Sequence, residues 1–411
     1  MSIQGTLKAI VKGKVLLTDY QGSLSPVLGY VVLYQGRKIV EIVSEQQHQQ
    51  QYKTGQVQEI DAAGNYVSPG FINQHIHGCG GTDAMDGTPE ALLNVAREQA
   101  RYGVTSFLPT TMTSSPQAMA QALTAIEETM GLQEAESSQN WDGEAIMGAR
   151  ILGCHLEGPF ISKAQKGAQK EKYILPANFE LLAPWQHTIK LLTIAPEALA
   201  IDQPWDFVTS CRKAGILLSI GHTNADYQVT LDMINSYGVQ HFTHLYNAMT
   251  GLHHRHPGAV GAALDTDVYC ELICDNIHVA PAMQRLVYRL KGAHRLILIT
   301  DSIRACGLGD GKSELGGQEV FVQNQKATLA DGTIAGSVLT MNQGIANLAE
   351  NLNLPIWAAT TCATVTPAKG LNIYEKTGSL TQGKDADIVI FDDHMNIQQT
   401  ICQGRTIYVN N

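Results

Sequence analysis

The middle of the chain repeats one pattern of hydrophobic and polar positions. Short apolar runs of strand length recur there, and the longer segments between them have the spacing of helices. We predict eight strands from these runs, at Val67–His77, Thr105–Thr111, Ile151–Glu157, Lys190–Pro196, Ile216–His222, Gln240–His244, Tyr269–Asp275 and Leu296–Asp301.

The segments between these runs carry helix start and stop signals. Thr88-Pro89 and Ser115-Pro116 place proline at a first helical position, and Gly103 and Gly131 are typical of helix ends. Eight strand–helix units predict a (β/α)₈ TIM-like barrel, whose chemistry lies at the carboxyl ends of the strands.

Both ends of the chain have a different, β-rich pattern. We predict short strands at Leu7–Val11, Val15–Thr18, Gly29–Tyr34, Arg37–Val43, Asp387–Phe391 and Thr406–Val409. The glutamine-rich segment Glu45–Gln51 is interpreted as a surface loop. We therefore expect residues 1–66 and 378–411 to form one small β-sandwich domain, and residues 67–377 to form the barrel domain.

Composition narrows the possible functions. The 411 residues carry a formal charge of −10, which argues against nucleic acid or an anionic membrane as a partner. The N-terminal segment lacks a signal-peptide pattern, and no apolar run reaches membrane-spanning length. The eight cysteines show no paired spacing, so free thiols in a cytoplasmic protein are expected.

Metal-ligating residue types gather where the predicted strands end. Because the carboxyl ends of barrel strands converge on one mouth, these side chains would surround one point. Nitrogen and oxygen ligands without thiolates suit zinc or iron. The candidate ligands are His75, His77, Glu157, His222, His244 and Asp301.

The strand ends resemble those of the amidohydrolase superfamily, and within it the N-acetylglucosamine-6-phosphate deacetylase family. The resemblance extends over nearly the whole chain. The segments that carry it are His155-Leu-Glu-Gly-Pro-Phe, Gly221-His-Thr-Asn-Ala, Thr243-His-Leu-Tyr-Asn-Ala-Met, Pro257-Gly and Ala335-Gly-Ser-Val-Leu-Thr-Met.

The resemblance implies hydrolysis of the N-acetyl group of a 6-phosphorylated amino sugar, with release of acetate. Glu157, His222 and His244 match the family's main metal ligands, and Asp301 matches its general acid/base. Some relatives have Gln and Asn in place of the His75 and His77 pair and use a single metal. Since both histidines are present here, one or two divalent ions are expected.

Substrate contacts are also implied by the resemblance. Gln169 stands where some relatives have a histidine that stabilises the oxyanion, although an exposed loop residue is an equal alternative. Asn247, Ala248, His278 and Arg255 match residues that bind the phosphate. The family's arginine reaches the neighbouring subunit's site, which implies a homodimer.

Three alternatives remain at this point. The substrate could be N-acetylgalactosamine 6-phosphate, because the two sugars differ at one hydroxyl. A cyclic amidase or deaminase is disfavoured, since Lys190 begins the fourth strand and no lysine ends it. A metal-free barrel that only binds sugar phosphates is disfavoured because Asp301, His222 and His244 are all present.

Overall fold

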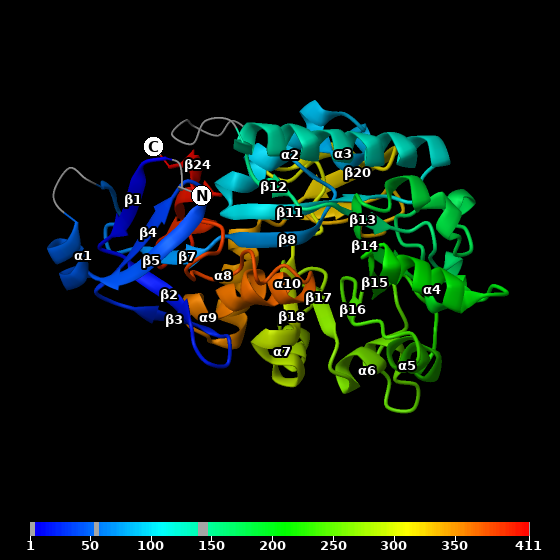
Figure 1. Cartoon of the computed structure of the whole chain (residues 1–411). Helices are drawn as coiled ribbons and strands as arrows, with labels where there is room; N and C mark the ends of the chain where they lie inside the picture. The colour runs from blue at the N-terminus through cyan, green and yellow to red at the C-terminus, as the bar shows by residue number, and fades with distance from the viewer. Residues whose placement is uncertain (1–4, 53–56, 139–146, 411) are drawn as a thin grey trace.

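A computed structural model describes residues 5–52, 57–138 and 147–410. Its centre is a barrel of parallel strands, as predicted (Figure 1). The eight barrel strands are β8 (Phe71–Ile76), β11 (Val104–Thr111), β13 (Cys154–Glu157), β14 (Ile189–Ile194), β15 (Leu217–Ile220), β16 (His241–Phe242), β17 (Tyr269–Ile273) and β18 (Leu296–Ile299).

The first and last barrel strands meet just beyond their carboxyl ends. The backbone N–H of Asp301 donates to the carbonyl of His75 at 2.9 Å, and that of His77 donates to the carbonyl of Ser302 at 2.9 Å. These bonds place the predicted strand-one and strand-eight site residues side by side.

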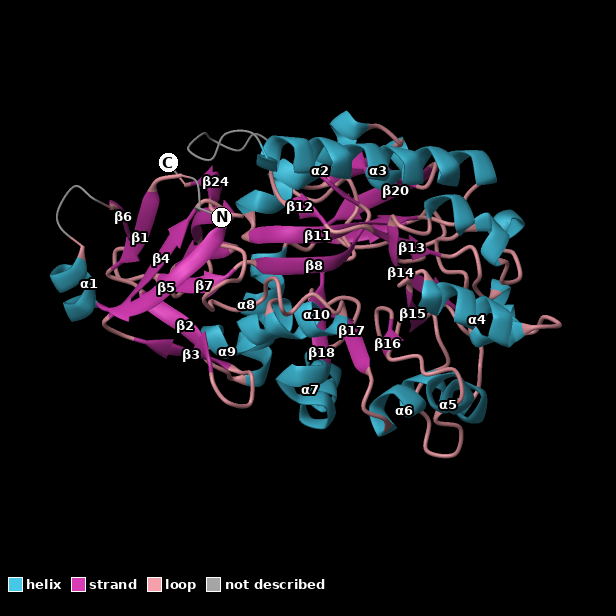
Figure 2. Ribbon diagram, in the orientation of Figure 1, coloured by secondary structure: helices cyan, strands magenta, loops and turns pink. Residues whose placement is uncertain are grey.

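Helices surround the barrel (Figure 2). They are α2 (Pro89–Arg101), α3 (Pro116–Ser138), α4 (Pro204–Lys213), α5 (Tyr227–Asn235), α6 (Gly258–Asp265), α7 (Pro281–Arg295), α8 (Met341–Leu352), α9 (Ile356–Ala359) and α10 (Val365–Gly370). The predicted stop at Gly103 is confirmed, because this residue follows α2 with a positive φ of 80°. The stop predicted at Gly131 is wrong, since α3 continues through it. None of the helices in the described ranges is long and apolar enough to cross a lipid bilayer.

Strands from both ends of the chain form two further sheets beside the barrel (Figure 1). A four-stranded sheet has the order β5-β4-β1-β6, and a six-stranded sheet has the order β24-β23-β22-β7-β2-β3. Side chains from both sheets share one buried cluster, which includes Ile10, Val32, Val67 and Ile388. The strands are β1 (Leu7–Val11), β2 (Lys14–Thr18), β3 (Leu24–Val27), β4 (Tyr30–Gln35), β5 (Lys38–Ser44), β6 (Gln58–Asp61), β7 (Tyr66–Pro69), β22 (Ile388–Phe391), β23 (Ile397–Cys402) and β24 (Arg405–Val409).

Two predicted strands are each divided in the structure. The run Val67–His77 is β7 in the six-stranded sheet followed by β8 in the barrel, with Gly70 between them. A side chain at Gly70 would collide with Thr105, because its Cβ would lie 2.2 Å from that residue's Oγ1. Likewise, the run Ile151–Glu157 begins in β12 (Arg150–Ile151) and resumes in β13 after Gly153.

The segment Glu45–Gln51 is a helix, α1, so its interpretation as a loop is wrong. Ser44 and Gln47 form a capping box, in which each side chain bonds the other residue's backbone N–H. This pair satisfies N–H groups that would otherwise lack partners at the helix start.

Two small sheets were not predicted. One is the hairpin β9 (Gly78–Cys79) and β10 (Thr82–Asp83), directly after the first barrel strand. The other consists of β19 (Gly311–Leu315), β20 (Gln318–Gln323) and β21 (Lys326–Thr328) and is inserted after the last barrel strand. Gln318 Nε2 donates to the carbonyl of Ala168 at 2.6 Å, which ties this second sheet to the loop that carries Gln169.

Candidate metal centre

The chain bends sharply where three barrel strands reach the mouth. His222, His244 and Asp301 have positive φ values of 48°, 29° and 49°. L-residues adopt this region rarely, and when they do the strain is often found at functional sites. Just before His222, Gly221 leaves room for the neighbouring strands, since a Cβ there would lie 2.8 Å from Thr243 Cβ.

The six predicted ligands converge around the carboxylate of Glu157. Its Oε1 lies 3.1 Å from His244 Nε2, 3.3 Å from His222 Nε2 and 3.5 Å from His75 Nε2. Its Oε2 lies 3.5 Å from His77 Nε2. Asp301 completes the group, with its Oδ1 3.4 Å from His75 Nε2 and 3.2 Å from His77 Nε2.

These separations fit ligands that share metal ions. Ligand atoms bound at about 2.0–2.2 Å around a tetrahedral ion stand roughly 3.3 Å from one another. Among the described residues, three groups of buried ligand atoms lie close enough to share an ion: Glu157 with His222 and His244, His75 with His77 and Asp301, and His75 with His155 and Glu271. The third is not favoured as a metal site, because both ring nitrogens of His155 already face hydrogen-bond partners. The carboxylate of Glu157 also lies 3.5 Å from His75 Nε2 and from His77 Nε2, so it can contact ions in either of the first two groups.

The ring nitrogen atoms of the cluster point to the same conclusion. His75 Nε2 is buried and has no hydrogen-bond partner within the described residues. His222 Nε2 and His244 Nε2 face each other at 3.1 Å, and both face Glu157. When these nitrogens are unprotonated, their lone pairs converge beside a carboxylate, which is the arrangement that a divalent cation requires.

The electrostatics of the cluster favour positive charge. Burial works to lower the pKa of His244, but Glu157, together with the charges of Asp301 and Glu271, outweighs it and raises that pKa to about 9. For His77, burial is likewise outweighed, chiefly by Asp301, and the pKa rises to about 9. Burial raises the pKa of Glu157, yet hydrogen bonds from His222 and His244 hold it well below its ordinary value. A metal ion would replace the protons that these histidines otherwise hold.

A cavity of about 510 Å³ opens over the cluster. It is bordered by the loop of residues 163–169, by the insertion after the last barrel strand and by the loop after β16. Asn247, Ala248 and His278, which were predicted to contact the substrate, line this cavity. His278 Nδ1 lies 2.6 Å from Asp275 Oδ2, which fixes the orientation of its ring.

Arg255 is placed differently. It is exposed, does not line this cavity, and its Nη1 lies 2.7 Å from His254 Nε2. Its predicted contact with a neighbouring subunit therefore stays a prediction.

Gln169 is buried, so the alternative of an exposed loop residue is wrong. Its Oε1 accepts from the backbone N–H of Thr113, and its Nε2 donates to Glu157 Oε2, both at 2.6 Å. These bonds place an amide N–H group directly against the candidate metal cluster.

Glu271 is a site residue that the strand-end analysis missed. It is the third residue of β17, is 1% exposed, and its Oε2 lies 3.0 Å from His75 Nδ1. A glutamate inside an otherwise apolar strand was the available signal, because charged residues are almost never fully buried without a partner.

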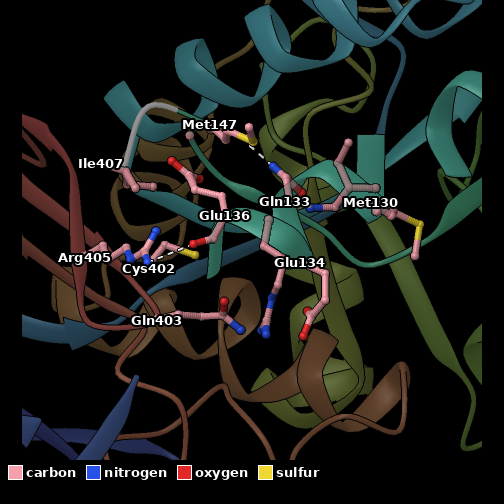
Figure 3. A pocket seen from close by; sticks show the side chains of 13 residues that line it. Met130, Gln133, Glu134, Glu136, Met147, Cys402, Gln403, Arg405 and Ile407 are labelled. Carbon is pink, nitrogen blue, oxygen red and sulfur yellow. Dashed lines mark hydrogen bonds between the residues drawn. The ribbon is translucent and has the colours of Figure 1, made fainter. Parts of the chain in front are cut away.

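A second cavity, of about 380 Å³, lies between the end of α3 and strands β12, β23 and β24 (Figure 3). The residues lining it include no histidine. Arg150 at its edge is already paired with Asp385 at 2.9 Å and Asp387 at 3.3 Å. Arg405 donates to the backbone carbonyl of Glu136 at 2.9 Å. Each group of potential metal ligands in the described ranges contains His75 or Glu157, and none of their members borders this second cavity.

Comparison with known proteins agrees with this architecture. Residues 66–407 match the model of the amidohydrolase family. The N-acetylglucosamine-6-phosphate deacetylase of Bacillus subtilis (strain 168) is 39% identical over 388 residues, 93% of each chain. The N-acetylgalactosamine-6-phosphate deacetylase of Escherichia coli O157:H7 is 34% identical over 85% of this chain and 89% of its own.

The crystal structure of the N-acetylglucosamine-6-phosphate deacetylase of Pasteurella multocida superimposes with a TM-score of 0.87 at 28% identity. The match covers 98% of this chain and 100% of that one. The chain therefore belongs to the amidohydrolase family, and to the branch that contains the N-acetylglucosamine-6-phosphate deacetylases.

Proposed function

We propose that this protein uses a divalent metal, zinc or iron, to hydrolyse the N-acetyl group of N-acetylglucosamine 6-phosphate. The products are glucosamine 6-phosphate and acetate. The observation that carries the proposal is the convergence of Glu157, four histidines and Asp301 beneath one cavity. The names of the relatives supply the substrate class.

The metal would be held by Glu157, His222 and His244, with His75, His77 and Asp301 available for a second ion. When bound, it supplies an activated water and polarises the amide carbonyl. An amide requires both, because its carbonyl is a poor electrophile and its nitrogen a poor leaving group.

Asp301 is the proposed proton carrier. It lines the cavity, and burial raises the pKa of its carboxyl, but the neighbouring His75 and His77 lower it to about 2. The carboxylate is therefore ionised and free to accept a proton from the attacking water, whose acidity a bound metal would raise. It then delivers that proton to the sugar nitrogen, which leaves as a neutral amine.

Gln169 is the proposed donor to the oxyanion. Its amide nitrogen carries two hydrogens: one bonds Glu157 at 2.6 Å, and the other faces Met112 Sδ, a weak acceptor, at 3.5 Å. The second can be offered to an oxygen that gains charge in the transition state. Because Thr113 holds the amide oxygen, the donor is oriented before the substrate arrives.

The phosphate is proposed to bind at the outer side of the cavity. Asn247 and Ala248 lie past β16, and the ring of His278, oriented by Asp275, borders the same cavity. Arg255 is exposed and would serve the site of a second subunit, which makes a homodimer in the cytoplasm part of the proposal.

The galacto sugar is the second candidate, because a relative at 34% identity is an N-acetylgalactosamine-6-phosphate deacetylase. Side-by-side measurement of kcat/KM on both N-acetylhexosamine 6-phosphates distinguishes the two. A cyclic amidase is disfavoured, since Lys190 lies near the start of β14, at the end of the strand opposite the mouth.

A further inference from the structure

Glu271 joins three parts of the barrel from beneath the metal cluster. Its Oε2 lies 3.0 Å from His75 Nδ1 and accepts from the backbone N–H of His244 at 3.2 Å. Its Oε1 accepts from Gln74 Nε2 at 2.7 Å. One carboxylate thus contacts a ligand of each proposed metal group.

Burial of this carboxylate is costly. Glu271 is 1% exposed, and within the described residues its only ion pair is with His75. A charge in the interior of a protein persists only when it is compensated. Donors from His75, His244 and Gln74 hold this charge, and a cation bound at Nε2 of His75 would add to the same compensation.

The geometry determines which nitrogen of His75 faces the mouth. An ionised carboxylate can only accept, so His75 Nδ1 carries the hydrogen in this contact. The lone pair of Nε2 then points between Glu157 and Asp301, at 3.5 Å and 3.4 Å. A carboxylate behind a histidine strengthens that histidine as a ligand and typically changes metal affinity about 10- to 100-fold.

We propose that Glu271 is a positioning residue that makes this chain retain a second metal ion, in the group of His75, His77, Glu157 and Asp301. It touches neither the substrate nor the ion and acts through His75. The inference rests on the proposed metal centre. It states that Glu271, which is not itself a metal ligand, determines how many ions the chain retains.

The test is the zinc content of the purified protein, measured by mass spectrometry after chelation, reconstitution and removal of free metal. The wild type is expected to retain about two ions per chain, and Glu271→Leu about one, held by Glu157, His222 and His244. Ser219→Ala is the matched control, because it removes a buried hydroxyl that bonds Thr243 within the barrel, outside the ligand set. The Ser219→Ala variant is expected to retain two zinc ions per chain, like the wild type.

Glu271→Gln makes the test independent of packing defects. Gln74 Oε1 is buried without a partner in the described chain. If the side-chain amide of Gln74 turns by half a rotation, this oxygen accepts a hydrogen bond from the amide nitrogen of the introduced glutamine. The hydrogen bonds then survive and only the charge is lost. Chelator competition is expected to show about a 10-fold weaker second zinc ion.

Two results would overturn the inference: a wild type that retains one ion, or Glu271→Leu and Glu271→Gln variants that both bind two ions as tightly as wild type. Neither result affects the proposed function if acetate is still released. Conversely, loss of one ion in Glu271→Leu supports the inference even if the protein deacetylates no sugar phosphate.

Discussion

His222 Nε2 and His244 Nε2 lie 3.1 Å apart, and both face the same oxygen of Glu157. They come from the ends of neighbouring strands, β15 and β16, and both residues have positive φ. Strained backbone thus brings two imidazole lone pairs and a carboxylate to one point. This arrangement is unfavourable without a cation, and it motivates the predictions that follow.

Replacement of Asp301 by Asn separates proton transfer from metal binding. Because the Glu157, His222 and His244 group is unaltered, at least one ion should remain bound. Loss of the proton carrier should lower kcat about 10²- to 10⁴-fold. Acetate release and metal content are measured on the same sample. A variant that keeps most of its activity would remove Asp301 from the mechanism.

Gln169→Ala removes the proposed oxyanion donor. We expect kcat to fall about 10²- to 10³-fold with little change in KM, since the contact is made in the transition state. Gln169 also bonds Glu157, so metal content must be measured alongside. A rise in KM at constant kcat would assign Gln169 to ground-state binding instead.

Arg255→Ala tests the shared phosphate site. The variant should show a KM about 10- to 100-fold higher for the 6-phosphorylated sugar, because a charge-assisted contact is lost. Weak activity on the unphosphorylated sugar should be unchanged. Arg289→Ala, at an exposed arginine on α7, is the control and should resemble the wild type. Equal losses on both sugars would indicate a structural role for Arg255.

His241 should make the metal-free protein sensitive to acid. Burial lowers its pKa from 6.5 to about 4, so between these values the unfolded chain binds a proton that the folded chain does not. Stability should therefore fall as the pH drops from 6.5 toward 4. Between pH 7.5 and 4.5, the wild type should lose about 2–3 kcal/mol more than His241→Gln.

Urea unfolding of chelator-treated protein at the two pH values measures this difference. Chelation removes metal release at low pH as a separate cause of acid sensitivity. If both proteins lose the same stability, then His241 is already protonated in the folded state at pH 4.5.

The fold and the six clustered residues could be predicted because both follow from the regular recurrence of apolar, strand-length runs along the sequence. Apolar runs mark the strands, and a barrel brings the carboxyl ends of its strands together irrespective of the conformation of the loops. Hence His75, Glu157 and Asp301 are close in space although 226 positions separate the first from the last.

What could not be predicted depends partly on contacts between distant segments and partly on local signals that are weak in the sequence. Glu271 lies within an apolar strand, and only the packed barrel shows that it faces His75. Gly131 continues a helix because nothing there requires a positive φ. The helix α1 was missed because glutamine content outweighed the short Ser44 and Gln47 capping signal.

Metal-dependent release of acetate from N-acetylglucosamine 6-phosphate tests the central claim most directly. Chelator-treated protein should release acetate at the background rate, and added zinc or iron should restore turnover. The claim would be contradicted if the metal-replete protein released no acetate from any 6-phosphorylated N-acetylhexosamine, or if the metal-free protein kept full activity.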